Sequence, residues 1–212
     1  MYLPKSSGRR TAVAVFIGPS LAGLIVFCLI PIVSSLVFSF MDYDLLAGTM
    51  KWVGLKNFLR ILTGREFPQV LTHTLTYLGL YLPLILATSI AEGMLLNNAF
   101  KGRQLFRTIF YLPVITSWVA AAVVWQWVLS GKYGMLNQIL STIGIEGPAW
   151  LSSQSWAMPG IVMTAVWKDA GYYALMVLAA LKSIDTSYYE AAAIDGAGPV
   201  RRFFGITLPL LS

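Results

Sequence analysis

The feature that most constrains the fold is an uncharged apolar run of 30 residues, from Thr11 to Phe40. As one α-helix this run would be about 45 Å long, which exceeds the roughly 30 Å hydrocarbon core of a bilayer. A secretory signal has an apolar core of only about 7–15 residues, so the run predicts an uncleaved membrane span. Pro19 and Pro31 are expected to bend this span or to mark its working ends.

Three further apolar runs predict three more spans. They cover Leu75–Ala91, Thr108–Gly131 and Trp156–Leu181. The chain is 57% hydrophobic and 11% charged, whereas a soluble domain carries about 25% charged residues. We therefore predict an all-α, polytopic membrane protein with four transmembrane helices, in which Met41–Leu71 and Lys132–Ser155 are loops.

The basic residues indicate which loops face the cytoplasm. The N-terminus and residues 97–107 and 182–202 hold nine of the 15 Lys and Arg residues. The loops on the other side hold five, and four of these are spread over the 31 residues of Met41–Leu71. Because cytoplasmic loops are enriched in Lys and Arg, we expect the N-terminus in the cytoplasm. The sequence shows no basic stripe with interleaved aromatic residues, so we expect no nucleic-acid partner.

The segment Tyr188–Pro209 mixes charge, small residues and turn residues near the C-terminus. Ser187 and Glu190 have the three-residue spacing of a capping box, which predicts that a helix begins there. Gly196 is expected to end that helix at positive φ, and Pro199 is expected to occupy the first position of the next helix. The pattern predicts two short helices joined by a sharp turn.

Seven positions of this segment resemble the EAA loop of ABC-importer permeases. They are Glu190, Ala191, Ala192, Gly196, Ile206, Leu208 and Pro209. The resemblance implies that these residues couple the membrane subunit to a cytoplasmic ATPase. An amphipathic helical hairpin lying on a membrane surface is the alternative interpretation of the same residues.

The resemblance extends over nearly the whole chain, from about residue 13 onward. Residues 53–58 read VGLKNF, which is similar to an element that follows the first span of sugar-type permeases. Gly134, Asn137 and Trp150 also fall where such permeases carry these residue types. The group that the chain resembles is the carbohydrate-uptake permeases, which include the maltose and glycerol-3-phosphate permeases.

This resemblance implies an architecture and a set of partners. Residues 1–71 would carry an N-terminal cytoplasmic tail, the first span and an external loop, and residues 72–212 would form the permease core. The family has two more spans after the EAA loop, so we expect the chain to be incomplete relative to its six-span pattern. The implied partners are a cytoplasmic ABC ATPase dimer, a second permease subunit and an external solute-binding protein, at the bacterial inner membrane. No cofactor is implied.

Catalytic chemistry is not indicated by the residues themselves. Gly131-Lys132 is followed by Tyr133 and lacks the upstream glycine of a phosphate-binding loop, so ATP hydrolysis is expected in a separate subunit. One histidine, His73, and one cysteine, Cys28, are too few for a zinc site of the usual kinds.

Lys168 and Asp169 interrupt the fourth apolar run, where each charge costs roughly 2.5–3.5 kcal/mol at mid-membrane. Adjacent residues on a helix do not face each other, so each charge needs its own water or partner, and Gly171 is expected to permit a local break. Either the two charges face an aqueous pathway or a partner helix, or they pair with further spans or mark a bend. Trp167 joins them as a substrate-pathway candidate, because tryptophan can stack on sugar rings. Packing against lipid or in an interfacial belt is the alternative for this tryptophan.

Two other classes of function have to be weighed against an ABC permease. One is an ion-coupled secondary transporter, and the other is a membrane scaffold that transports nothing. A secondary transporter should place ionisable groups in paired halves, and Lys168-Asp169 has no counterpart in the other half of the sequence. A scaffold would not need the seven-position match, so the ABC permease is the prediction that we favour.

Overall fold

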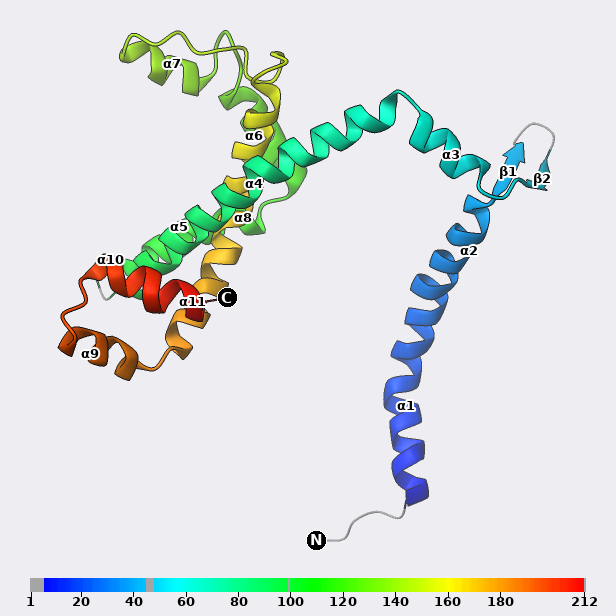
Figure 1. The fold of residues 1–212 in the computed structure, drawn as a ribbon, viewed down its shortest axis with the longest axis horizontal. Helices are drawn as coiled ribbons and strands as arrows, with labels where there is room; N and C mark the ends of the chain where they lie inside the picture. The colour runs from blue at the N-terminus through cyan, green and yellow to red at the C-terminus, as the bar shows by residue number, and fades with distance from the viewer. Residues whose placement is uncertain (1–5, 45–47, 99, 212) are drawn as a thin grey trace. The chain divides into compact units, whose positions relative to one another are not determined.

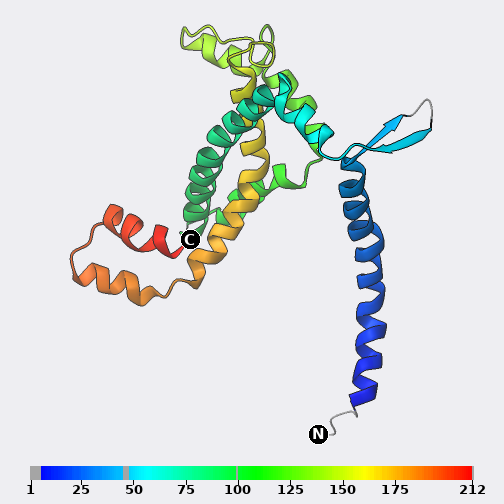
Figure 2. The ribbon, with the colours of Figure 1, turned by 45° about the vertical axis from the view of Figure 1, so that its right-hand side comes forward.

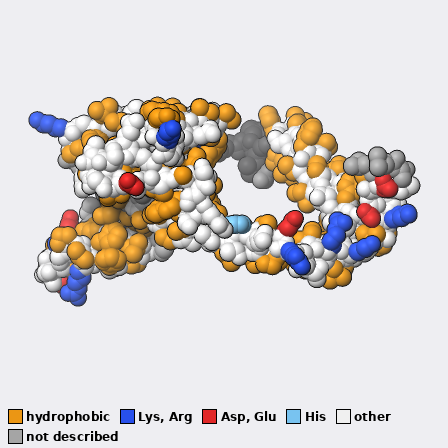
Figure 3. Space-filling model, turned by 90° about the horizontal axis from the view of Figure 1, so that it is seen from above, with side chains coloured by type: hydrophobic (Ala, Val, Ile, Leu, Met, Phe, Trp, Pro, Cys, Tyr) orange, Lys and Arg blue, Asp and Glu red, His pale blue; other side chains and the backbone are white. Residues whose placement is uncertain are grey.

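The computed structural model describes residues 6–44, 48–98 and 100–211, and most of these residues are helical, as predicted. Figure 1 shows the order of the elements along the chain. The chain divides into two compact units, residues 1–71 and 72–212, and each is described by itself. In Figure 3 hydrophobic side chains spread over the visible surface of the helices, whereas charged side chains are sparse. Such helices need lipid or protein around them.

The first predicted span is a long helix with one widened turn. It consists of α1 (Ser6–Leu24), the π-turn η1 (Ile25–Leu29) and α2 (Ile30–Ser39), and Val13–Ser39 is long and apolar enough to cross a membrane. In η1 the backbone N–H of Ile30 bonds to the carbonyl of Ile25, five residues back. Pro31 follows two residues after η1, and its ring would crowd the carbonyl four residues before it, which accounts for the wider turn.

The stretch Met41–Leu71, predicted as a loop, contains structure of its own. Strands β1 (Met41–Asp44) and β2 (Thr49–Trp52) pair antiparallel, so the all-helical prediction misses a small hairpin. Helix α3 (Lys56–Thr63) follows. The side-chain amide of Asn57 donates to the carbonyls of Ser39 and Met41, at 3.0 and 2.9 Å, and thereby ties α3 to the root of the hairpin. These two bonds account for the presence of asparagine in the VGLKNF element.

Two of the remaining predicted spans are single helices, and their residues from 72 onward belong to the second unit. They are α4 (Glu66–Asn97) and α8 (Ala157–Ser183), which lie side by side in Figures 1 and 2. Ile85 of α4 packs with Val162, Val166 and Ala170 of α8 in a buried cluster. A Cβ on Gly93 would lie 2.7 Å from the side chain of Val177, so glycine is needed where α4 meets α8.

The third predicted span, Thr108–Gly131, is broken rather than straight. Helices α5 (Arg103–Ile115) and α6 (Trp118–Val128) meet at an angle of 103°. The hydroxyl of Ser117 accepts the N–H of Ala120 at 3.1 Å and caps α6, so the chain starts a new helix there. By length and composition the described residues therefore hold three candidate spans, or four if the bent pair counts as one.

Gly171 brings α5 against α8 and does not break α8. The helix continues through Lys168, Asp169 and Gly171, contrary to the local break that we expected. A Cβ on Gly171 would overlap the carbonyl oxygen of Phe110 and would lie 2.7 Å from its carbonyl carbon. Glycine is required here because two backbones approach each other closely.

The predicted loop Lys132–Ser155 contains the short helix α7 (Met135–Thr142) and is organised by Asn137. The side-chain nitrogen of Asn137 lies 2.9–3.2 Å from the carbonyl oxygens of Gly131, Gly147 and Pro148. Its side-chain oxygen accepts the indole N–H of Trp150 at 2.6 Å. The residue types that matched the sugar-permease pattern in this region thus hold the loop together.

Candidate functional site

The first candidate site is the helical hairpin that follows α8. Its first helix, α9 (Thr186–Ile194), is capped by Asp185, whose carboxylate accepts the backbone N–H of Ser187 at 2.8 Å. This bond lowers the pKa of Asp185 below its ordinary value, because the donated N–H favours the charged carboxylate. The predicted capping box of Ser187 and Glu190 is therefore wrong. Glu190 lies within α9 and its side chain is exposed.

The turn after α9 has the conformation that the sequence predicts. Gly196 has φ +71°, its N–H bonds to the carbonyl of Ala193 at 3.1 Å, and the N–H of Ala197 bonds to the carbonyl of Ala192 at 2.8 Å. This pair of bonds is the Schellman motif, which satisfies the last carbonyls of a helix. Ala197 is buried behind the turn.

The second arm of the hairpin begins at Pro199, the first residue of α10 (Pro199–Arg202), as predicted. It continues through the π-turn η2 (Phe203–Thr207) into α11 (Leu208–Leu210). The two arms are tied together, since Arg202 Nε donates to the carbonyl of Ala197 at 2.6 Å and the hydroxyls of Tyr189 and Thr207 are 3.0 Å apart. Figure 2 shows the arms as the orange and red segments.

The seven EAA-like residues fall on this one hairpin. Glu190, Ala191 and Ala192 lie on α9, Gly196 is the turn, Ile206 lies in η2, and Leu208 and Pro209 lie on α11. Large apolar side chains beside them are exposed, notably Ile194 at 88%, Val200 at 71% and Phe204 at 62%. Exposed apolar groups clustered on a short hairpin are typical of a protein-binding surface.

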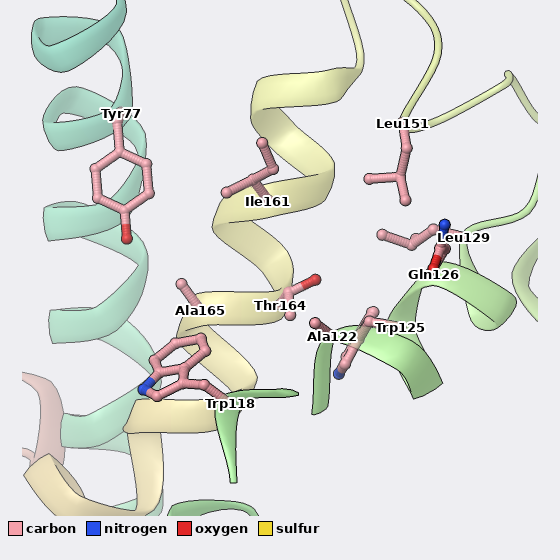
Figure 4. Close-up of a pocket in the computed structure, with 10 residues that line it drawn as sticks. All are labelled: Tyr77, Trp118, Ala122, Trp125, Gln126, Leu129, Leu151, Ile161, Thr164 and Ala165. Atoms are coloured by element: carbon pink, nitrogen blue, oxygen red, sulfur yellow. The ribbon is translucent and has the colours of Figure 1, made fainter. Parts of the chain in front are cut away.

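The second candidate site is a cavity of about 310 Å³ between α4, α6 and α8. Figure 4 shows its lining: Tyr77 comes from α4, Trp118, Trp125 and Gln126 from α6, and Thr164 from α8. The rest of the lining is apolar. Aromatic faces with a few amide and hydroxyl groups suit a small ligand that has both apolar and hydrogen-bonding faces.

The three predicted pathway residues lie around this cavity and do not line it. The Trp167 ring packs edge to face against that of Trp125, with 5.6 Å between the centroids. Lys168 is buried, with 4% of its surface exposed, and Nζ donates to the carbonyl of Val114 on α5 at 3.0 Å. Asp169 accepts the hydroxyl of Tyr81 on α4 at 2.9 Å. The sequence left open whether the two charges face an aqueous pathway or a partner helix, or pair with further spans or mark a bend. The structure favours partner helices for both, because Lys168 bonds to α5 and Asp169 bonds to α4.

Sequence reasoning missed the residues that complete this arrangement. Tyr77, Tyr81 and Trp118 occur in apolar runs that give no sign of a cavity, and Val114 contributes only its backbone oxygen. The one usable signal is the Ser117-Trp118 pair, because serine before an apolar residue is a helix N-cap pattern.

Comparison with known proteins identifies the family of the chain. Residues 84–212 match a family described as "Binding-protein-dependent transport system inner membrane component". The probable ABC transporter permease protein YesP of Bacillus subtilis is 41% identical over 93% of this chain and 64% of its own length. The trehalose/maltose permease MalF of Thermococcus litoralis is 35% identical over 91% of this chain and 65% of its own length. The sulfoquinovosyl glycerol permease SmoG of Agrobacterium fabrum is 31% identical over 96% of this chain and 67% of its own length.

A solved structure is similar as well. A bacterial ABC transporter involved in the import of alginate superimposes with a TM-score of 0.81 at 29% identity, over 98% of this chain and 70% of that one. The chain spans about two thirds of the length of the curated relatives it matches. These matches confirm the family resemblance drawn from the sequence motifs. The chain belongs to the family of binding-protein-dependent transport system inner membrane components.

Proposed function

We propose that this chain is a membrane-spanning permease subunit of a bacterial ABC importer and that its solute is a carbohydrate or polyol. The observation that carries the proposal is the hairpin α9–α11, which presents Ile194, Val200 and Phe204 to a partner beside the seven EAA-like residues. The solute class is supported by relatives named for trehalose/maltose, sulfoquinovosyl glycerol and sn-glycerol-3-phosphate transport. It is also supported by the aromatic cavity.

The proposed partners bind the subunit at its cytoplasmic face, within the membrane and at its external face. An ATPase dimer binds the hairpin on the cytoplasmic side and hydrolyses ATP, since the chain carries no phosphate-binding loop in its sequence. A second permease subunit completes the pathway across the membrane. A binding protein delivers the solute from outside. This last partner is supported by the similar bacterial alginate ABC transporter, which has been solved in complex with an alginate pentasaccharide-bound periplasmic protein.

The proposed mechanism is alternating access driven through α8. Only Ile184 and Asp185 separate the end of α8 from the start of α9, so a displacement of the hairpin is passed directly to a helix that lines the cavity. ATP binding can shift the equilibrium between inward- and outward-open states only if the ATPase contacts the hairpin differently in the two states.

A reconstitution experiment tests this function against its alternatives. Proteoliposomes that contain a six-span permease carrying this sequence, an ATPase subunit, a second permease and a binding protein should accumulate labelled maltose or trehalose, and uptake should require both internal ATP and the binding protein. Uptake that follows a proton or sodium gradient without ATP would identify an ion-coupled secondary transporter instead. Failure of any ATPase to co-purify, with no uptake, would support a non-transporting scaffold.

The orientation is tested by thiol labelling of intact cells in a Cys28→Ser background. Lys51→Cys and Ser152→Cys should react with an impermeant reagent from outside, whereas Lys101→Cys should react only after the cells are opened, because the 97–107 loop is basic. Lys51 and Ser152 are chosen because they are exposed. Lys101 is chosen in place of Gly102, because Gly102 has φ +91° and a cysteine there would strain the backbone. Labelling of the 101 position alone would reverse the orientation and place the hairpin outside.

A further inference from the structure

Lys168 and Asp169 are neighbours in sequence, but each bonds to a different helix beside the aromatic cavity. Successive residues on an α-helix point about 100° apart, so the two side chains leave α8 in different directions. Lys168 reaches the junction of α5 and α6, and Asp169 reaches α4. Both charges are thereby satisfied inside the described part of the chain.

Lys168 contacts both sides of the 103° bend between α5 and α6. Helix α5 ends at Ile115, so the carbonyl of Val114 is one of its last oxygens, which have no partner within the helix and carry partial negative charge. The ammonium group donates to this oxygen at 3.0 Å. The same group lies 5.2 Å from the centre of the Trp118 ring, at the first residue of α6. One buried cation thus fixes how α6 leaves α5.

Asp169 supports the α4 side of the cavity through two tyrosines. Its carboxylate accepts the hydroxyl of Tyr81 at 2.9 Å. The ring of Tyr81 stacks on that of Tyr77, with 5.3 Å between centroids and 11° between the ring planes. Tyr77 lines the cavity from α4, and Trp118 lines it from α6. Each charge therefore acts on a cavity-lining aromatic ring: Lys168 directly on Trp118, and Asp169 through Tyr81 on Tyr77.

We propose that Lys168 and Asp169 are positioning residues that hold the Trp118 and Tyr77 walls of the cavity at the separation that a sugar ring requires. They do not contact the sugar. This inference rests on the proposed carbohydrate function, but it assigns the two charges a role different from that of pathway-lining residues. It also explains why charged side chains occur inside a membrane span, where a buried charge persists only with a partner.

The first test measures the geometry without any sugar. Gln126→Cys, in a Cys28→Ser background, places a thiol in the cavity on α6. In nanodiscs, adding Lys168→Met should change the rate at which this thiol reacts with a small reagent. The substitution removes the ammonium group that contacts both the Trp118 ring and the carbonyl of Val114 at the bend. Lys168→Arg should restore the original rate, since the guanidinium also donates to a carbonyl and stacks on an indole. Lys182→Met, an exposed lysine at the end of the same helix, is the matched control.

The second test measures sugar selection in the reconstituted importer. Lys168→Met and Asp169→Asn should raise the KM for maltose or trehalose uptake by about tenfold, which corresponds to about 1.4 kcal/mol of sugar binding, because the aromatic walls are no longer held in place. The kcat at saturating sugar should change little, because positioning affects binding rather than coupling. A loss of kcat at constant KM would instead indicate less folded protein and would overturn the proposal.

The outcomes separate this inference from the function on which it rests. If wild type transports sugar and Trp125→Ala raises the KM while Lys168→Met and Asp169→Asn change neither the KM nor the thiol rate, the positioning role is wrong and the carbohydrate function stands. If the wild-type importer takes up neither maltose nor trehalose but Lys168→Met still changes the reaction rate of the cavity thiol, the carbohydrate function is wrong. The support of the cavity walls by the two charges then stands.

Discussion

Replacing Gly171 by valine should remove most of the folded protein from the membrane. The new Cβ would overlap the carbonyl oxygen of Phe110 and would come within 3.3 Å of the Cα of Tyr111, so it meets backbone rather than a flexible side chain. Overpacking a tight interface costs roughly 1–3 kcal/mol, and backbone obstacles place this site at the upper end. Helix α5 would have to move away from α8, which would also separate Lys168 from Val114.

Gly79→Val is the matched control for this prediction. Gly79 lies in the middle of α4, and beyond its neighbouring residues and the backbone of its own helix a Cβ there meets no described atom within 4 Å. The yield of monodisperse protein in detergent and its thermal midpoint should fall sharply for Gly171→Val and only slightly for Gly79→Val. Equal thermal midpoints for the two variants would show that the approach of α5 to α8 is not required.

Replacing Gly196 by aspartate should uncouple the permease from its ATPase without preventing membrane insertion. A Cβ at Gly196 meets no described atom within 4 Å, and aspartate is among the residues that tolerate a left-handed conformation, so the change is mild for the chain itself. The added carboxylate lies close to the exposed Ile194, on the surface that we propose for the ATPase. ATPase co-purification should fall strongly, and solute-stimulated ATP hydrolysis should be lost.

The control for this variant comes from the arginines of the same hairpin. Arg202 is unsuitable because its Nε holds the carbonyl of Ala197, whereas Arg201 is exposed. Arg201→Gln should therefore retain most of the co-purified ATPase and most of the hydrolysis. Normal association and turnover in Gly196→Asp would mean that this hairpin is not the coupling element, and the ABC function would lose its main support.

The spans and the hairpin were predictable because their signals are local. A predominantly apolar run of sufficient length marks α4 and α8, and a glycine followed by a proline three residues later marks the turn between α9 and α10. The break between α5 and α6 was missed because residues 108–131 on both sides of it are uncharged, so apolar content does not reveal a change of direction. Ser117 carried the signal as an N-cap, but it lay inside a run long enough to be one span.

The contacts around the cavity were not predictable for a different reason. Lys168 binds a backbone oxygen, and every residue type supplies the same oxygen, so the sequence does not identify Val114 as its partner. Gly171 was misinterpreted because glycine serves both flexible breaks and close backbone approaches, and only the position of Phe110 distinguishes them. The cap at Asp185 was missed because Ser187 offered a familiar spacing two residues later.

The two π-turns affect how helical wheels should be drawn for this chain. In both η1 and η2 a backbone N–H bonds five residues back, and a proline, Pro31 or Pro209, follows two residues after the turn. Each wide turn holds one residue more than an α-turn, so every side chain after it is rotated by about 100° relative to a regular helix. A wheel drawn without a break from Pro199 to Leu210 therefore assigns Leu208 and Pro209 to the wrong face of the hairpin.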